Sequence, residues 1–147
     1  RAPRVPPRRL VLDRGATLPR NSHLARTAQS IPVEVLAAQP DPERVAALKS
    51  VGVAVYEAPS LAAHLTGLRE RGVRHLFVEG GAAVADAFLQ GGFVDRWVIF
   101  QTPVPLGEGA LRLATALPSA GGLAGWTVVS RRSFGPDRCT TYRPVSR

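Results

Sequence analysis

A carboxylate and a glycine pair stand together in the run LFVEGGAAVADAFLQGG at positions 76–92. Glu79 ends an apolar run, Gly80 and Gly81 follow, and small and apolar residues then recur at helical spacing. Glycine lets the backbone approach a bound group closely, and the free N–H groups at a helix start attract phosphate. Two interpretations remain open: a cofactor diphosphate on residues 81–87 with Glu79 beside the substrate, or a tight turn with a solvated acid. The full G-x-G-x-x-G pattern is absent.

Other common site chemistries find little support in the sequence. His23, His64 and His75 lack the spacing of metal ligands, and Cys139 is the single cysteine. We therefore predict no metal site and no internal disulfide. His64 on a predicted helix and His75 at a predicted strand start are assigned to the surface, and Cys139 is assigned to a packed or edge-strand position. Neither a G-x-S-x-G elbow nor a phosphate-binding G-x-x-x-x-G-K-[ST] loop is present.

Predicted strands and helices alternate along the first two thirds of the chain, and they position Glu79. Apolar runs bounded by turn residues predict strands, and apolar spacing with caps and stops predicts helices. Strands are predicted at 8–13, 31–38, 53–58 and 73–81, and helices at 40–52, 60–72 and 81–92. This alternation is typical of βαβ units and a mainly parallel sheet. Ligands of such sheets bind beyond the carboxyl ends of the strands, so Glu79 would face that crevice.

The last third has a different pattern. The segment 94–107 begins as a strand and ends in a proline-bearing loop, and a connection rich in Gly, Ala and Leu follows. Two β-rich segments within 126–145 then flank Gly-Pro-Asp at 135–137, which predicts a hairpin. The expected sheet is therefore mixed, with an antiparallel C-terminal edge. We expect residues 1–147 to form a single domain.

Composition and charge narrow the class of protein. The formal net charge is +8, and Lys49 is the single lysine among 19 Lys and Arg residues. The arginines are scattered, without the clustered basic stripe that nucleic-acid binders show, so a genomic preference for arginine is favoured over nucleic-acid binding. A field that attracts an anionic small substrate is the other open interpretation. No apolar run reaches membrane-spanning length and no signal peptide is apparent, so we predict a cytoplasmic protein.

The central run resembles a known enzyme family. The stretch LFVEGGAAVADAFLQGGFVDRWVIFQTPVPLG is similar to the C-terminal reductase domain of the bifunctional riboflavin biosynthesis deaminase/reductase. That family has a V-E-G-G strand end, an L-x-x-G-L-V-D helix end and a P-x-L-L-G loop. The matched positions are Glu79, Gly80, Gly81, Asp95, Pro103 and Gly107, and the flanking segments RRLVLD and FGPD also agree.

The resemblance implies a fold and a reaction. The fold is α/β and similar to dihydrofolate reductase, with a mixed, mainly parallel sheet flanked by helices and an antiparallel C-terminal hairpin. The reaction is NADPH-dependent reduction of the ribosyl group of 5-amino-6-(5-phosphoribosylamino)uracil to ribityl. By the same resemblance Glu79 contacts this phosphorylated pyrimidine substrate. The residues expected to bind the cofactor are Gly80, Gly81, Ala82, Ala83, Val84, Ala85, Asp86, Ala87 and Arg14.

This chain departs from the family pattern in two places. Arg14 stands where the family usually has serine, and an arginine there could meet a phosphate instead. The family's reductase domain also begins with a further strand, helix and loop that this sequence lacks, so the chain is expected to be the C-terminal two-thirds of a longer domain. The resemblance further implies a homodimer and a fused or preceding deaminase domain absent from this chain. The alternatives are a reductase acting on another pterin or pyrimidine, a non-catalytic basic binding module, and a folded remnant without activity.

Overall fold

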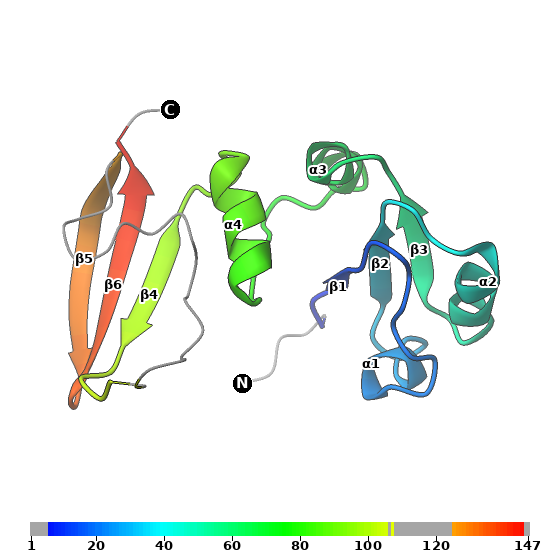
Figure 1. The fold of residues 1–147 in the computed structure, drawn as a ribbon, viewed down its shortest axis with the longest axis horizontal. Coiled ribbons are helices and arrows are strands. Elements are labelled where there is room, and N and C mark those ends of the chain that lie inside the picture. Colours follow the sequence, from blue (N-terminus) through cyan, green and yellow to red (C-terminus); the bar gives the residue numbers. More distant parts are fainter. Residues whose placement is uncertain (1–5, 106, 108–124, 146–147) are drawn as a thin grey trace. The chain divides into compact units, whose positions relative to one another are not determined.

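The computed structural model describes residues 6–105, 107 and 125–145. The chain divides into two compact units, residues 1–75 and residues 76–147. Figure 1 shows a sheet with helices in the first unit, and a helix with a second sheet in the described part of the second unit. The Gly, Ala and Leu-rich connection predicted after the proline-bearing loop lies outside the described residues.

The first unit is built on a three-stranded parallel sheet in the order β1-β2-β3. Its strands are β1 (Arg9–Leu12), β2 (Val33–Ala37) and β3 (Ala54–Glu57), and its helices are α1 (His23–Arg26), α2 (Pro42–Ser50) and α3 (Leu61–Glu70). The predicted strands and the two longer helices are confirmed. The short helix α1 was not predicted, because its four residues are too few for a helical pattern and they directly follow the turn-prone segment 14–22. Ser22 starts it by accepting a hydrogen bond from the Ala25 N–H at 3.2 Å.

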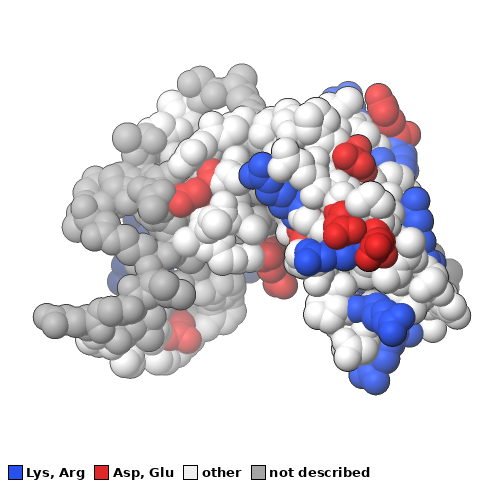
Figure 2. Space-filling view, turned by 45° about the vertical axis from the view of Figure 1, so that its right-hand side comes forward, with Lys and Arg blue, Asp and Glu red and all other residues white. Residues whose placement is uncertain are grey.

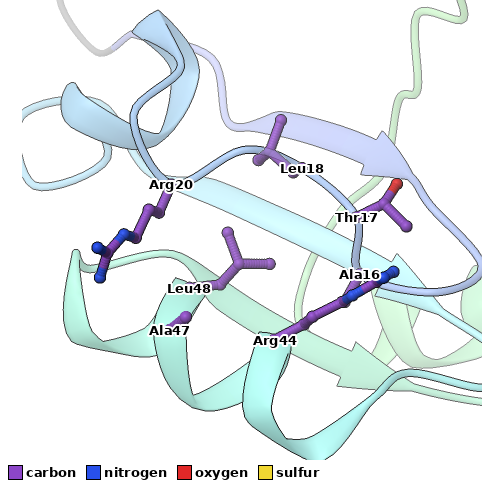
Figure 3. A pocket seen from close by; sticks show the side chains of 7 residues that line it. All are labelled: Ala16, Thr17, Leu18, Arg20, Arg44, Ala47 and Leu48. Atoms are coloured by element: carbon purple, nitrogen blue, oxygen red, sulfur yellow. The ribbon is translucent and has the colours of Figure 1, made fainter.

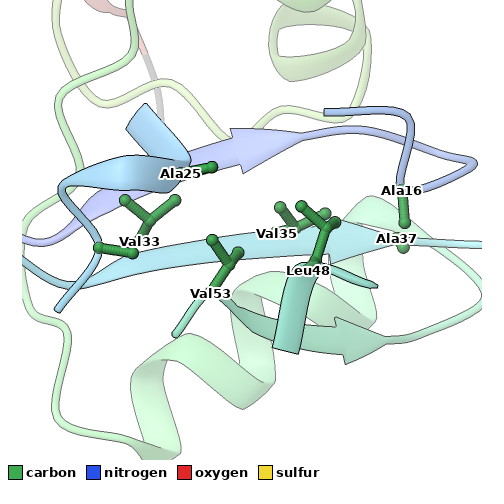
Figure 4. Packing of buried hydrophobic residues seen from close by; sticks show 8 residues of the cluster. Ala16, Ala25, Val33, Val35, Ala37, Leu48 and Val53 are labelled. Atoms are coloured by element: carbon green, nitrogen blue, oxygen red, sulfur yellow. The ribbon is translucent and has the colours of Figure 1, made fainter. Parts of the chain in front are cut away.

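The core of this unit lies on one face of the sheet. Alternate residues of β2, Val33, Val35 and Ala37, are buried together with Ala25 of α1 and Leu48 of α2 (Figure 4). All of β2 is buried, as expected for the central strand of a parallel sheet that is covered on both faces. The apolar run 31–38 therefore becomes a strand because it can bury side chains on either side.

Two helices of this unit end in the same way, each at a glycine, of which Gly52 was predicted from the sequence as a stop. Gly52 after α2 has φ +90° and Gly72 after α3 has φ +85°. In each case the next residue donates back into the helix, from the Val53 N–H to the Leu48 carbonyl and from the Val73 N–H to the Leu68 carbonyl. This bond pattern is the Schellman motif, which requires a left-handed residue at that position and therefore favours glycine.

A buried carboxylate lies on the central strand. Glu34 is 5% exposed, and its two carboxylate oxygens each lie 3.3 Å from a guanidinium nitrogen, one of Arg8 and one of Arg71. The Arg71 guanidinium also lies over the Tyr56 ring, 3.7 Å from the centroid. The two arginines and the aromatic ring thereby compensate the cost of taking the carboxylate out of water.

Replacing Glu34 with alanine is expected to lower the free energy of unfolding by about 2 kcal/mol. Breaking a buried ion pair typically costs about 3–5 kcal/mol, but Arg8 is half exposed and can regain water. Urea unfolding followed by circular dichroism measures the change. Glu57→Ala is the matched control, because Glu57 is an exposed carboxylate at the end of β3. If Glu34→Ala and Glu57→Ala unfold at the same urea concentration, the contacts of Glu34 with the two arginines do not stabilise the fold.

The second unit contains α4 (Ala82–Gln90) and a three-stranded antiparallel sheet. Its strands, in the order β4-β6-β5, are β4 (Trp97–Gln101), β5 (Trp126–Phe134) and β6 (Asp137–Pro144). The predicted hairpin is confirmed, and Gly135 in its turn has φ +61°. Trp97 and Trp126 pack edge to face with ring centroids 5.8 Å apart. Cys139 lies on the central strand of this sheet and is half buried, so the edge-strand alternative for it was wrong.

The predicted fourth strand at 73–81 was wrong. Among the described residues, 73–80 belong to no helix, strand or turn, and neither sheet includes them. The apolar run stays exposed: Phe77 is 83% exposed, and Leu76 and Val78 are also accessible. An apolar pattern suits a strand, but a strand forms only where a partner's N–H and C=O groups complete the ladder. The mixed α/β class is confirmed, with the parallel and antiparallel strands in two separate sheets.

Candidate functional site

The start of α4 has unsatisfied backbone donors. Gly81 is the N-cap residue, with φ −72° and ψ 178°, and no side chain caps the helix. The Val84 and Ala85 N–H groups both donate to the Gly81 carbonyl, whereas the N–H groups of Ala82 and Ala83, which begin the helix, have no intrahelical acceptor. The positive end of the helix dipole lies at the same place. This terminus can therefore receive an anionic group, as the sequence hypothesis requires.

The two glycines before α4 differ in whether their surroundings have room for a side chain. A Cβ on Gly80 would lie 2.9 Å from the Val84 Cβ, so the local fold requires glycine there. A Cβ on Gly81 would meet nothing within 4 Å, and the Gly81 φ of −72° suits any residue. The fold therefore gives no steric reason for glycine at position 81. Close approach of a bound group is a reason that remains.

The other predicted residues of this segment lie on or beside α4. Glu79 is exposed and precedes the glycine pair, but it does not end a paired strand as predicted, because the segment 73–80 pairs with no strand of the described chain. Of the α4 residues assigned to the cofactor, two are exposed and four are half buried: Ala83 and Ala87 are exposed, and Ala82, Val84, Ala85 and Asp86 are half buried.

Arg14 lies in the first unit, two residues after the end of β1. Its Nη2 donates to the Gln39 Oε1 at 2.9 Å, and its carbonyl accepts from the Ala38 and Gln39 N–H groups. Arg14 is thus at the carboxyl end of β1, next to the residues that follow β2. The remaining predicted site residues, 79–87, belong to the second unit.

A shallow groove of about 360 Å³ lies beside this turn, between the loop after β1 and helix α2 (Figure 3). Its apolar lining includes Leu18 and Leu48, and two arginines, Arg20 and Arg44, border it. In Figure 3 the two guanidinium groups point in opposite directions, and Arg44 extends toward Ala16. Neither Arg20 nor Arg44 was among the site residues predicted from the sequence. One feature of the sequence could have pointed to Arg44. It lies in the first turn of α2, where a positive charge opposes the helix dipole and is therefore unusual.

The histidines do not form a metal site in the described part of the chain, where no group of three or more His, Cys, Asp and Glu side chains could hold a metal ion. The surface assignment of His64 was wrong: this side chain is 6% exposed, and its Nε2 lies 3.0 Å from the Ala37 carbonyl. Burial follows from its place on the face of α3 that also buries Leu68. His75 is exposed as predicted.

Sequence comparison places these residues in a family. The sequence profile described as RibD C-terminal domain matches residues 1–140, a range that includes every candidate site residue. The chain belongs to this family. The riboflavin biosynthesis protein RibD of Aquifex aeolicus (strain VF5) is 30% identical over 103 residues, which are 70% of this chain and 29% of that protein. The chain therefore spans less than a third of the length of this RibD relative.

Solved structures support the fold of a RibD C-terminal domain. Acinetobacter baumannii RibD, form 2, has a TM-score of 0.78 at 24% identity, covering 95% of this chain and 38% of that one. A diaminohydroxyphosphoribosylaminopyrimidine deaminase/5-amino-6-(5-phosphoribosylamino)uracil reductase from Thermotoga maritima has a TM-score of 0.69 at 22% identity, with coverages of 95% and 38%. The similarity to the dihydrofolate reductase fold inferred from the sequence is thereby confirmed. No helix in the described ranges has the length and apolarity needed to cross a membrane.

Proposed function

We propose that this RibD C-terminal domain acts as an NADPH-dependent reductase on 5-amino-6-(5-phosphoribosylamino)uracil and converts its ribosyl group to ribityl. The observation that carries the proposal is Gly81, a glycine that no steric contact requires at a helix N-terminus without a side-chain cap, in a chain of this family. The uracil base and the phosphoribosylamino group of this substrate are those in the printed name of the Thermotoga maritima relative.

The residues of α4 suit the phosphates of the cofactor. Gly81 and the small side chains of Ala82 and Ala83 leave the first-turn N–H groups accessible. Each N–H can donate to a phosphate oxygen, and the helix dipole adds to the attraction. NADPH, when bound, supplies the hydride for the reduction. The protein supplies position and charge, with Glu79 as the exposed acceptor for the N–H or O–H groups of the substrate.

Calorimetric titration of NADPH, with NADH as the comparison, tests the cofactor. We expect micromolar binding with NADPH preferred, because the additional phosphate of NADPH carries charge that arginine side chains can bind. Absence of binding to either dinucleotide would contradict the proposal for this chain. The homodimer and the deaminase domain remain predictions of the resemblance, and the cytoplasmic location remains a prediction from the apolar pattern of the sequence.

A further inference from the structure

Two aromatic side chains lie together on one face of the antiparallel sheet in the second unit. Phe100 of β4 is opposite Cys139 of β6, and Phe134 of β5 is opposite Asp137, two residues earlier on β6. Opposite residues, and residues two apart on one strand, share a face of a sheet. Both rings therefore project from the same side and meet over β6, where their centroids are 6.3 Å apart and their planes are inclined by 41°.

Both phenylalanine rings stay accessible although they contact each other. Phe100 is 69% exposed and Phe134 is 56% exposed, and Val98 on the same face of β4 is 41% exposed. On the opposite face of the sheet, Trp97 and Trp126 pack edge to face and are half buried. Large apolar side chains that gather on a surface commonly mark a binding site. The phenylalanine pair is therefore a candidate contact surface.

Positive charge accompanies the phenylalanine pair. Arg132 of β5 lies opposite Cys139 on the same face, and Arg143 lies further along that face of β6. Residues 126–144 contain four arginines, and Asp137 is the one acid among them. In the first unit, by contrast, Figure 2 shows acidic side chains among the basic ones. The face thus combines accessible aromatic rings with an excess of positive charge.

Pairing of the strands assembles this surface from residues that are distant in the sequence. Phe100 comes from β4, whereas Arg132 and Phe134 come from β5. β6 lies between these two strands (Figure 1) and joins them into one sheet. The arginines are therefore scattered in the sequence but lie among aromatic rings on the sheet. Binding surfaces for nucleic acid combine these two kinds of side chain.

We propose that this face of the antiparallel sheet binds single-stranded nucleic acid. Phe100 and Phe134 provide the rings on which bases stack, and Arg132 and Arg143 attract the phosphates. Exposed aromatic side chains on a sheet are an established means of binding unpaired bases. A second copy of this chain suits the face less well, because self-pairing would bring arginines of both copies into one interface. The inference goes beyond the proposed reductase and is independent of it.

Fluorescence anisotropy of the whole chain with labelled oligothymidylate and oligouridylate, each of about 12 nucleotides, tests the proposal. We expect both to bind with a dissociation constant on the order of 10 μM at low salt. A DNA duplex of the same length should bind more weakly, because its bases are already stacked on one another. Attraction by charge alone would give the opposite order, since the duplex has the higher charge density.

Phe100→Leu and Phe134→Leu should each weaken binding of the single strands by at least about fivefold, the factor that loss of one stacked base commonly causes. Leucine keeps an apolar side chain at each position but removes the ring. Phe77→Leu is the matched control. Phe77 is 83% exposed and lies outside both sheets, so this variant should retain the affinity of the unaltered chain.

Arg132→Gln should reduce the salt dependence of binding. Loss of one phosphate contact is expected to lower the slope of log K against log salt concentration by about 0.7 for a single strand. Arg131→Gln is the matched control for charge, because Arg131 is the exposed neighbour of Arg132 on β5 and successive side chains of a strand point to opposite faces. Its slope should equal that of the unaltered chain.

Three outcomes would overturn the proposal. In the first, the unaltered chain binds neither oligonucleotide. In the second, folded Phe100→Leu and Phe134→Leu variants bind as tightly as the unaltered chain. In the third, sedimentation velocity shows a dimer that these substitutions dissociate while no oligonucleotide binds, which would assign the face to a second copy. Circular dichroism verifies the fold of each variant, and Arg132→Gln decides the question if a phenylalanine variant does not fold.

Discussion

Replacing Gly81 with leucine is expected to weaken NADPH binding by about 100-fold or more. The leucine side chain would occupy the space through which phosphate oxygens reach the first-turn N–H groups of α4. Losing two charge-assisted hydrogen bonds of about 1.5–3 kcal/mol each accounts for this factor. The fold should tolerate the change, because a Cβ at position 81 meets nothing within 4 Å and the backbone there suits any residue. Calorimetric titration of NADPH measures the loss.

Gln90→Leu is the matched control for this variant. It adds the same side chain at an exposed position at the opposite end of α4, so it should leave NADPH affinity unchanged. Thermal unfolding of both variants separates a binding effect from a folding effect, since leucine is a poorer N-cap than glycine by up to about 1 kcal/mol. Unchanged affinity in Gly81→Leu would remove the cofactor from this helix terminus. A test at Gly80 would be ambiguous, because a side chain there clashes with Val84.

Replacing Glu79 with glutamine is expected to lower kcat/KM for the phosphorylated pyrimidine by about 10- to 100-fold. Glutamine keeps the size of the side chain but removes the charge, and a hydrogen bond to a charged acceptor is worth about 1.5–3 kcal/mol. NADPH affinity should change less than about twofold, since the predicted cofactor contacts begin at Gly80. The assay follows substrate-dependent loss of NADPH absorbance, together with a separate NADPH titration.

Glu70→Gln controls for the loss of an exposed carboxylate elsewhere, because Glu70 is exposed at the end of α3. Turnover by this variant should match that of the unaltered chain. If Glu79→Gln retains full turnover, Glu79 does not contact the substrate in the reaction. If NADPH affinity falls in parallel with turnover, Glu79 belongs to the cofactor site instead.

Local structure was largely predictable from the sequence because short-range chemistry decides it. Ser60 caps α3 by accepting a hydrogen bond from the Ala63 N–H, and Gly52 ends α2, as the residue types at those positions predict. At the end of α4, the Gly92 φ is +66° and the Phe93 N–H donates to the Phe88 carbonyl at 2.9 Å. Each signal involves groups within five or six residues of one another. The glycine pair and the uncapped start of α4 belong to this class.

The burial of side chains and the pairing of strands could not be predicted, because they depend on residues that are distant in the sequence. His64 was assigned to the surface, yet it is buried beside the Ala37 carbonyl. Glu34 is likewise buried, and the sequence order does not indicate its partners Arg8 and Arg71. The apolar run at 73–80 has strand composition but pairs with no strand of the described chain. Composition determines whether a segment can adopt a strand conformation. A strand forms only where the fold places a neighbouring strand with which it can form hydrogen bonds.

The sequence alone determined the family, the mixed α/β class and the small-residue helix start at Gly81, because these depend on residue type and local spacing. Only the tertiary structure decided that Gly81 is sterically unconstrained whereas Gly80 is not, and that the Arg44 guanidinium reaches the Gly15 turn from α2. The physical reason is that free space and proximity are properties of packed atoms. Residues 15 and 44 come together only when α2 packs beside the loop after β1.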